Sequence, residues 1–419
     1  IVCKIAEIVV VGGVRRSALI SLSNLSDDRM RHAKSGQWWN DNGQRALANN
    51  SACYTEKPDM GIFMEEWKSL YDSKSGERGI FNRESANMIS KKSGRRETEG
   101  HDFGTNPCSE IILRSREFCN LSEIVIRPED TMDSLKSKVR LATILGTFQS
   151  TLTNFKYVQK DWKKNCQEER LLGVSMTGIM DSVLTNGKQS GLKERLEELK
   201  QIAVDTNKKL AKEIGINQSA AITCVKPSGT VSQLVDSASG IHARHNPYYI
   251  RTVRGDIKDP LSKMMKDAGF PNEEDYMNQH NVVFSFPQSC SKKAVFRMDM
   301  TAIEQLEIWK TYQEHWCEHK PSVTVSVKEH EWLEVGAWVY SNFDFMSGVS
   351  FLPFTDHVYK QAPYQDCSEK EYKDLLNSMP KNVDWSKLSE YEDMDMTAGT
   401  QTLACNASGC EVVDLTASN

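Results

Sequence analysis

The chain of 419 residues is long enough to bury a substantial core, as one large domain or as two to three ordinary ones. Its 39% hydrophobic and 26% charged residues exclude an intrinsically disordered chain, and no apolar run is long enough to span a bilayer. The net charge of -5 comes from residues 380–419, because the residues before them carry equal numbers of acidic and basic side chains. Without a basic excess, neither a nucleic-acid polymer nor a membrane is expected as a partner, whereas small nucleotides remain possible ligands.

The cysteines and the first residues indicate the compartment. Eleven cysteines at uneven spacings, an odd number, are not typical of a secreted disulfide framework. No charged and apolar leader is visible around Ile1-Val2-Cys3, so a reducing cytoplasm is the expected location. Because the chain begins without Met, inside a predicted helix or strand, we expect a fragment whose N-terminal part is encoded or cut elsewhere.

Strands and helices alternate along most of the chain. Short β-branched runs predict strands at 19–22, 111–113, 124–126, 221–225 and 282–286 and at the alternating valines 323, 325 and 327. Apolar stripes of helical period predict helices over 135–152 and 192–214, and capping boxes predict helix starts at Thr301 and Ser368. This alternation predicts a mixed α/β fold. With no internal repeat or long linker, residues 1–379 are expected to form one continuous α/β body.

Residues 380–419 have a different character. Apolar residues become rare, acidic residues cluster, and Cys405 and Cys410 form a C-x4-C pair. This composition predicts a flexible tail. The pair could be half of a zinc site or two idle thiols, but no second pair of ligands is evident, so no metal is expected. An exposed dithiol on a mobile acidic tail suits thiol–disulfide exchange.

The segment Asn106-Pro107-Cys108-Ser109-Glu110 brings three reactive groups close in sequence. Pro107 disfavours a helix at Asn106, so the segment is expected to be a loop leading into the strand at 111–113. If the loop is extended, Asn106, Cys108 and Glu110 point to one side by the two-residue period. An amide, a thiol and a carboxylate would then converge. The alternative is a buried structural cysteine near a chance polar pair.

A second cysteine, Cys119, follows eleven residues after Cys108, after one strand and a short turn. With this spacing the sequence resembles the large catalytic chain of ribonucleotide reductases, and most of all the monomeric, adenosylcobalamin-dependent class. Two other stretches agree. Residues 9–18 are similar to the strand-turn segment of that family, with Gly13 where Asn is usual, and residues 170–178 are similar to its helix-opening signature.

The segment at 225–232, Val-Lys-Pro-Ser-Gly-Thr-Val-Ser, predicts a turn directly after a strand. Exposed N–H groups in such a turn can hold an anion, although an ordinary strand–helix turn explains the sequence equally well. In the resembled family a similar Pro-Ser-Gly-Thr loop holds the phosphates of the substrate. The resemblance therefore implies this role for Ser228, Gly229 and Thr230.

The resemblance also implies a fold and a mechanism. The expected fold is part of a ten-stranded α/β barrel with Cys108 on a central finger loop. A thiyl radical on Cys108 would abstract the ribose 3' hydrogen, Glu110 would act as general base, and Asn106 would hold the ribose hydroxyls. Cys119 and a second cysteine would supply two electrons. Adenosylcobalamin is the implied radical source, because no residue supplies that chemistry.

One element of the pattern departs from the family. The partner of Cys119 is expected on an early strand, and neither Cys3 nor Cys53 matches that position, so it would belong to a missing N-terminal portion. Cys405 and Cys410 would re-reduce the resulting disulfide and then be reduced by thioredoxin or a similar protein. The expected substrate is a ribonucleoside triphosphate or diphosphate, and the spacing favours the triphosphate.

Two other functions remain open from the sequence. The first is the large subunit of the iron-dependent class, whose radical arrives from a second protein, although Tyr248-Tyr249 is equally well a half-buried strand. The second is a catalytically silent half of a split reductase that acts by association. His315 and His319 have helical spacing without a Glu in the position a zinc protease would need, so we expect surface residues.

Overall fold

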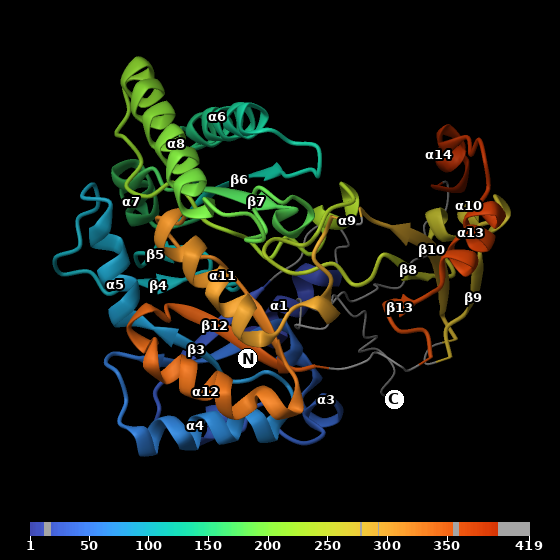
Figure 1. Ribbon diagram of the computed structural model, residues 1–419, viewed down its shortest axis with the longest axis horizontal. Coiled ribbons are helices and arrows are strands. Elements are labelled where there is room, and N and C mark those ends of the chain that lie inside the picture. The colour runs from blue at the N-terminus through green and yellow to red at the C-terminus, as the bar shows by residue number, and fades with distance from the viewer. Residues whose placement is uncertain (12–17, 277–278, 292, 355–359, 393–419) are drawn as a thin grey trace.

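The computed structural model describes residues 1–11, 18–276, 279–291, 293–354 and 360–392 (Figure 1). Its strands are β1 Leu19–Ser23, β2 Ala48–Tyr54, β3 Gly79–Asn82, β4 Gly104–Thr105, β5 Ile112–Leu113, β6 Asn120–Val125, β7 Leu172–Thr177, β8 Tyr248–Asp256, β9 Asn272–Glu274, β10 Asn281–Ser289, β11 Thr324–Val327, β12 Gly348–Pro353 and β13 Tyr364–Asp366. Its helices are α1 Val2–Val11, α2 Asp28–Arg31, α3 Trp38–Asp41, α4 Met60–Ser73, α5 Arg83–Lys92, α6 Met132–Gln149, α7 Lys160–Glu169, α8 Leu192–Ile214, α9 Val231–Leu234, α10 Pro260–Asp267, α11 Ala302–His315, α12 Trp332–Ser341, α13 Glu369–Ser378 and α14 Leu388–Tyr391. The mixed α/β fold predicted from the sequence is confirmed.

A five-stranded sheet of order β1-β2-β3-β12-β11 forms the first part of the main body. β1, β2 and β3 run parallel to one another, and β11 runs parallel to β12. The contact between β3 and β12 is antiparallel, so two groups of parallel strands meet there. Helices α4 and α12 lie below this sheet in Figure 1, and the ring of Trp67 from α4 meets Phe351 of β12 at 5.0 Å.

The pair β6–β7 continues the second group of parallel strands. The segment at 221–225, predicted to be a strand, links β7 to the chain ahead of β11 through the bridges Val174↔Thr223 and Val225↔Pro321. The main-chain bonds from Cys224 N–H to Val174 O and from Ser322 N–H to Val225 O support these bridges. Strand pairing is therefore continuous from β1 to β6. A closed ten-stranded barrel stays a prediction.

Helix α11 anchors this linking segment. Its Trp309 and its C-cap Trp316 are completely buried. The Trp309 indole donates to Pro321 O at 2.9 Å, and the Trp316 indole donates to Cys224 O at 2.8 Å. Both indoles thus fix the main chain on which the candidate site is built, and the capping box predicted at Thr301 is present.

Helix α6 corrects one sequence-based expectation. Leu135, Val139 and Ala142 of the predicted stripe are buried, but Leu145, Phe148 and Leu152 are exposed. The C-terminal half of α6 turns small and polar residues inward instead. Gly146 faces Leu172 of β7, where an added Cβ would make an ordinary contact at 3.5 Å, and Thr147 accepts a hydrogen bond from Asn207 of α8. Close helix packing decides the buried face here.

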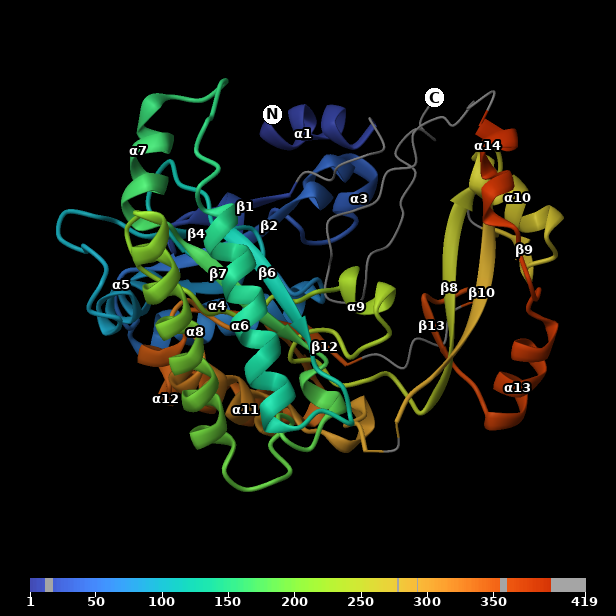
Figure 2. The same cartoon turned by 90° about the horizontal axis from the view of Figure 1, so that it is seen from above.

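A second sheet, of order β13-β8-β10-β9, stands beside the main body (Figure 2). Together with α10, α13 and α14 it forms a smaller body. The predicted strand at 282–286 is part of β10, and the predicted capping box at Ser368 opens α13. Ordered structure continues past residue 379, where the predicted tail begins. Trp385 packs against Phe270 with ring centroids 5.9 Å apart, and the Tyr391 hydroxyl donates to Asp267 of α10.

Cys405 and Cys410 lie outside the described residues. Among the helices that the structure describes, none combines the length and apolar character needed to cross a membrane.

Candidate active site

The Asn106–Glu110 segment forms the tip of a hairpin whose arms are β4 and β5. Asn106 shapes this tip, because its Oδ1 accepts the Ile111 N–H at 3.0 Å and its main-chain oxygen accepts the Ser109 N–H at 2.9 Å. Ser109 has a φ of 64°, in the left-handed region. The segment is a closed turn and not an extended strand, so the two-residue alternation predicted for Asn106, Cys108 and Glu110 is wrong.

Contacts from both groups of parallel strands hold this loop. From β2, the Asn49 amide donates to Pro107 O at 2.7 Å. From the segment ahead of β11, the Lys320 N–H donates to Glu110 O at 3.0 Å, and Lys320 Nζ donates to Ser109 Oγ at 2.7 Å. On β12, a Cβ on Gly348 would lie 2.4 Å from Ser109 Oγ, so glycine allows the loop to approach. The Cys108 loop is thus fixed at several points.

Glu110 has an unusual environment. Its side chain is 0% exposed, and among the described residues no donor hydrogen-bonds to either carboxylate oxygen. The nearest cation is Lys226, whose Nζ lies 3.6 Å from Glu110 Oε1. A buried carboxylate whose oxygens accept no hydrogen bond is costly, and a ligand that brings donors would remove that cost. Both oxygens therefore have unused capacity to accept hydrogen bonds.

The two predicted cysteines lie near the same carboxylate. Cys108 is partly exposed, and Cys108 and Glu110 both lie close enough to Lys226 to favour its charged form. Cys119 stands directly before β6 and packs against Leu171 and Ala220. Burial raises the pKa of the Cys119 thiol well above its usual value, and the charge of Glu110 raises it further. The structure thus brings Asn106, Cys108, Glu110 and Cys119 into one region.

The predicted phosphate loop lies next to this group. Ser228 has a φ of 55°, and its Oγ donates to Glu123 Oε2 of β6 at 2.6 Å. Gly229 and Thr230 are exposed and lead into the single turn of α9. Behind the loop, a Cβ on Gly240 would lie 2.3 Å from Lys226 O, so the loop has a close-fitting support. The Ser228 hydroxyl is therefore engaged by a carboxylate.

Sequence reasoning missed four residues of this site: Lys226, Lys320, Glu123 and His319. The expectation that His319 lies on the surface is wrong, because it is completely buried. Its Nδ1 accepts the Ile112 N–H at 3.2 Å, and its Nε2 lies 2.9 Å from Leu172 O, which requires a neutral ring with the proton on Nε2. Burial lowers the pKa of His319 to about 3. Helix α11 ends at His315, so His315 and His319 do not lie one turn apart on a single helix, as the sequence had suggested.

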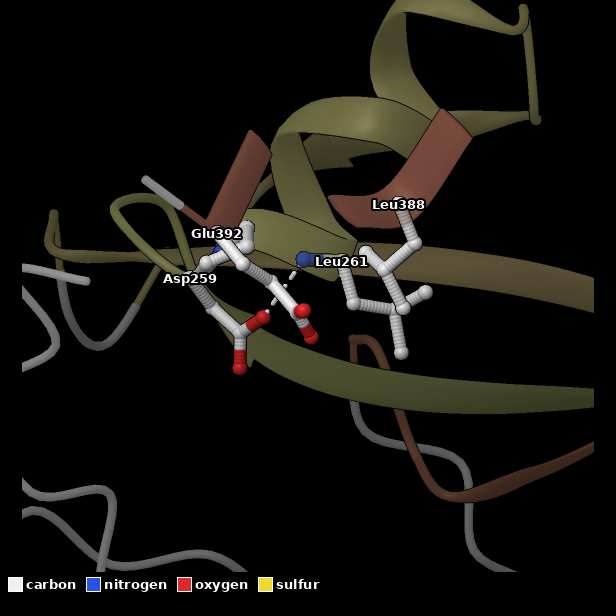
Figure 3. Close-up of a pocket in the computed structure, with 5 residues that line it drawn as sticks. Asp259, Leu261, Leu388 and Glu392 are labelled. Atoms are coloured by element: carbon white, nitrogen blue, oxygen red, sulfur yellow. Dashed lines mark hydrogen bonds between the residues drawn. The ribbon is translucent and has the colours of Figure 1, made fainter. Parts of the chain in front are cut away.

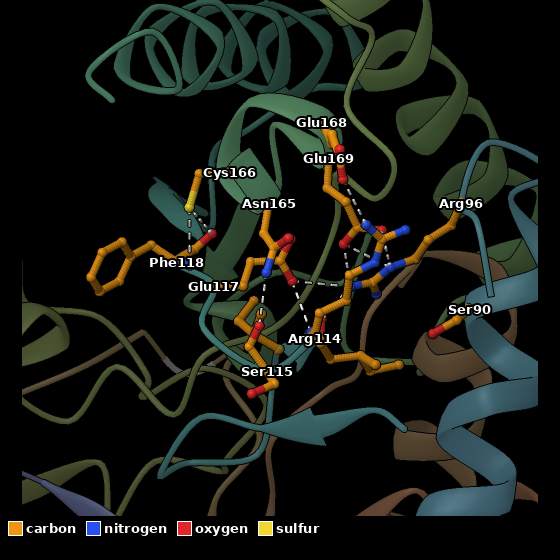
Figure 4. A network of polar contacts seen from close by, with 12 residues as sticks. Ser90, Arg96, Arg114, Ser115, Glu117, Phe118, Asn165, Cys166, Glu168 and Glu169 are labelled. Carbon is orange, nitrogen blue, oxygen red and sulfur yellow. Dashed lines mark hydrogen bonds and ion pairs between the residues drawn. The ribbon is translucent and has the colours of Figure 1, made fainter. Parts of the chain in front are cut away.

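A buried ionic network supports the turn before Cys119 (Figure 4). Arg96 donates to Glu169 through Nε at 2.9 Å and Nη2 at 2.7 Å, and Arg114 N–H donates to Glu117 at 2.9 Å. Burial raises the pKa of Glu117, and the adjacent Glu169 raises it further. The network fixes the chain two residues before the cysteine. A surface hollow lined by Arg114, Glu169 and Ala220 lies over it.

A second pocket lies between α10 and α14, in the smaller body (Figure 3). Its Asp259 is the N-cap of α10 and accepts the Leu261 N–H at 2.7 Å. Leu388 and Glu392 complete the lining, and this is an ordinary helix cap without catalytic groups.

Known proteins resemble this chain in sequence and in fold. No family model matches the sequence. The adenosylcobalamin-dependent ribonucleoside-triphosphate reductase of Lactobacillus gasseri is 28% identical over 91% of this chain and 54% of its own length. The reductase of the same name from Lactobacillus acidophilus is 26% identical over 97% of this chain and 58% of its own length. The chain spans about half the length of these curated relatives.

The fold is shared with solved reductases. A crystal structure of a B-12 dependent (class II) ribonucleotide reductase matches with a TM-score of 0.71 and 21% identity, over 90% of this chain and 56% of that one. The alpha subunit of the Actinobacillus ureae class Id ribonucleotide reductase matches with a TM-score of 0.54 and 11% identity, over 82% of this chain and 72% of that one. The comparisons identify the chain as a relative of the adenosylcobalamin-dependent ribonucleoside-triphosphate reductases, similar to them over about half of their length.

Proposed function

We propose that the chain carries the site that reduces ribonucleotides to 2'-deoxyribonucleotides by a thiyl-radical mechanism. The observation that carries this proposal is the buried carboxylate of Glu110, whose oxygens accept no hydrogen bond from the described residues. It lies two residues from Cys108, on a loop held at several points. A thiol, a base with unused acceptor oxygens and an amide are the groups that this chemistry requires. The named relatives support the same reaction.

The reaction begins and ends at Cys108. A thiyl radical on its sulfur takes a hydrogen atom from ribose C3', so that one C–H bond breaks and one S–H bond forms. Glu110 accepts the proton of the 3' hydroxyl group, and the 2' hydroxyl group leaves as water. Two electrons and two protons from a dithiol reduce the nucleotide, Glu110 returns its proton to the 3' oxygen, and the Cys108 thiol returns its hydrogen atom to C3'. Asn106 offers its Nδ2 amide to the ribose hydroxyls, because its Oδ1 is engaged by Ile111.

Cys119 supplies one of the two reducing thiols in this proposal. Its raised pKa keeps it protonated at neutral pH, so it can deliver hydrogen to the substrate. The second thiol comes from the part of the relatives' length that this chain does not match. The oxidised product is a disulfide, and Cys405 and Cys410 reduce it by thiol–disulfide exchange. Thioredoxin or a similar dithiol protein then reduces the tail.

The substrate in this proposal is a ribonucleoside triphosphate, as the names of the relatives suggest. The loop Ser228-Gly229-Thr230 would hold its phosphates through main-chain N–H groups. Glu123 already accepts a hydrogen bond from Ser228, and the Lys226 cation nearby offsets its charge. The expected barrel, with the Cys108 hairpin as its finger loop, would enclose the ribose between the loop and Lys226.

Adenosylcobalamin is the proposed cofactor, and the residues present fit it. Cys108 is the partly exposed thiol of the loop, whereas Glu110 beside it is completely buried. A radical source outside the loop can therefore reach the sulfur without displacing the base. When bound, the cofactor supplies the organic radical that converts a thiol to a thiyl radical. The loop holds the sulfur in place through Ser109 and Pro107.

The proposal is tested by measuring deoxyribonucleotide formation with adenosylcobalamin and a dithiol, in a preparation that includes the reductase segments this chain does not match. We expect cofactor-dependent product that is abolished in Cys108→Ser. Cys367→Ser, beyond β13 in the smaller body, is the control and should retain activity. Activity that persists in Cys108→Ser would overturn the mechanism. Activity that needs a second radical-bearing protein instead of adenosylcobalamin would overturn the assignment of this cofactor.

A further inference from the structure

Lys226 stands between the candidate base and the candidate phosphate loop, and neither assignment above gives it a role in the reaction. Its Nζ lies 3.6 Å from Glu110 Oε1, and its side chain is 29% exposed. Its main-chain N–H donates to Ser175 Oγ of β7 at 2.8 Å. The residue is thus fixed by its main chain and directs a cation toward a buried carboxylate.

Charged and titratable groups face Lys226 from three elements. Burial lowers the pKa of Lys226, but Glu110 and Cys108 of the finger loop, Cys224 of its own segment and Glu123 of β6 outweigh burial and raise it. Lys226 therefore carries a full positive charge at neutral pH. Cys119 and Cys224 also lie within electrostatic reach of Glu110.

Lys320 is the other cation near Glu110, and it differs in two respects. Its Nζ donates to Ser109 Oγ and to Ser347 O, so the group is committed to the loop and to β12. Burial lowers the pKa of Lys320 to about 7. Burial thus disfavours the charged form of Lys320, whereas the charges around Lys226 favour its charged form. Lys226 is consequently the main positive charge on the Glu110 carboxylate.

The carboxylate needs such a charge. Burial without hydrogen-bond donors favours the neutral form of a carboxyl group, and a neutral carboxyl group cannot accept a proton from a substrate hydroxyl. A cation 3.6 Å from Oε1 favours the ionised form without filling the lone pairs that the substrate would use.

The same lysine is connected to the phosphate loop. Its main chain holds Ser175, Ser175 Oγ donates to Glu123 Oε1 at 3.3 Å, and Ser228 donates to the other oxygen of Glu123 at 2.6 Å. We propose that Lys226 is a positioning residue that holds Glu110 as the carboxylate a general base requires and connects it to the phosphate loop. Its part in catalysis rests on the proposed function, whereas its interaction with Glu110 does not.

The interaction is measured in the unliganded protein by NMR titration of lysines labelled with carbon-13 at Cε, with the Lys226 signal assigned by its loss in Lys226→Arg. Since electrostatic coupling is reciprocal, removing the Glu110 charge must weaken the hold of Lys226 on its proton. We expect the midpoint of the Lys226 titration to fall by about one pH unit in Glu110→Gln, a tenfold change in proton affinity. Glu194→Gln on α8 is the control and should leave it unchanged. An unchanged midpoint in Glu110→Gln would overturn the inference, whether or not the protein reduces nucleotides.

The consequence for catalysis is measured as the pH dependence of kcat. In Lys226→Met the acid limb of the profile should move to higher pH, because Glu110 then loses its cation, and Lys226→Arg should restore it. Lys193→Met on α8 is the matched control. An acid limb that stays in place in an active Lys226→Met enzyme would contradict the positioning role and leave the proposed function standing.

Discussion

Lys320 Nζ donates a hydrogen bond of 2.7 Å to Ser109 Oγ, so a completely buried lysine holds the residue that follows Cys108. The same Nζ donates to Ser347 O at 3.3 Å and lies 4.8 Å from the centre of the Phe81 ring. The main-chain N–H of Lys320 donates to Glu110 O. One residue therefore fixes the loop at Ser109, which lies between the candidate thiol and base, and at the main chain of Glu110.

Ser109→Ala tests whether this bond positions Cys108. The variant keeps the turn closed by Asn106 but removes the acceptor for Lys320 Nζ. We expect kcat to fall by about tenfold while KM stays near its wild-type value, because small displacements of a reacting atom are costly. Steady-state kinetics check this, with Ser378→Ala at the end of α13 as the control. A wild-type kcat in Ser109→Ala would show that the loop holds its shape without Lys320.

Lys320→Met tests the buried amine through the pH dependence of stability. Burial lowers the pKa of Lys320 to about 7, whereas a lysine in an unfolded chain titrates near about 10.4. Between these pH values the unfolded state binds more protons, so the lysine makes the free energy of unfolding rise with pH. Urea denaturation should show this rise in the wild-type protein and a smaller rise in Lys320→Met. Lys193→Met should follow the wild-type curve, and identical slopes in all three proteins would refute the lowered pKa.

Arg96→Met tests the network that supports the turn before Cys119. Arg96 makes two hydrogen bonds to Glu169, and both side chains are almost completely buried. Removing the cation leaves Glu169 without its main partner, and breaking such a buried pair costs about 3 to 5 kcal/mol of unfolding free energy. The exposed pair Arg116–Asp161 is the control, because Asp161→Asn should cost less than about 1 kcal/mol. Chemical denaturation compares the two, and equal losses would mean that burial of the pair is unimportant.

Cys405→Ser tests the predicted redox tail, whose cysteines lie outside the described residues. Cys119 and its partner supply the electrons of one turnover in our proposal, so a single turnover should remain intact in this variant. Recycling by thioredoxin should stop, because the exchange needs both tail thiols. Rapid-quench measurement of product per active site separates the two phases. Normal multiple turnover in Cys405→Ser would rule out the tail role.

Sequence reasoning proposed candidate residues that lie close together along the chain. Asn106, Cys108 and Glu110 are neighbours in sequence, and Cys119 follows within one hairpin, so a local pattern could identify them. The geometry still differed from expectation. The left-handed φ of Ser109 and the bond from Asn106 to Ile111 close a turn, which the two-residue alternation cannot describe.

The remaining residues of the site come from distant parts of the chain. Lys226 and Lys320 meet Glu110 only because the linking segment at 221–225 pairs with both β7 and the chain ahead of β11. A single sequence carries no signal for such pairing. His319 was missed for a related reason, since its burial depends on the position where α11 ends.

Exchange of the ribose 3' hydrogen tests the central claim most directly, because that step involves Cys108 and Glu110 before any electron from Cys119 is used. A substrate labelled with tritium at C3' is incubated with adenosylcobalamin and the protein, supplied as in the activity assay, and tritium released to water is counted. Release from the wild-type protein, with none from Cys108→Ser or Glu110→Gln, is the predicted result. Release that survives in Cys108→Ser would contradict the account, because the hydrogen would then leave without the thiol on which the proposed mechanism depends.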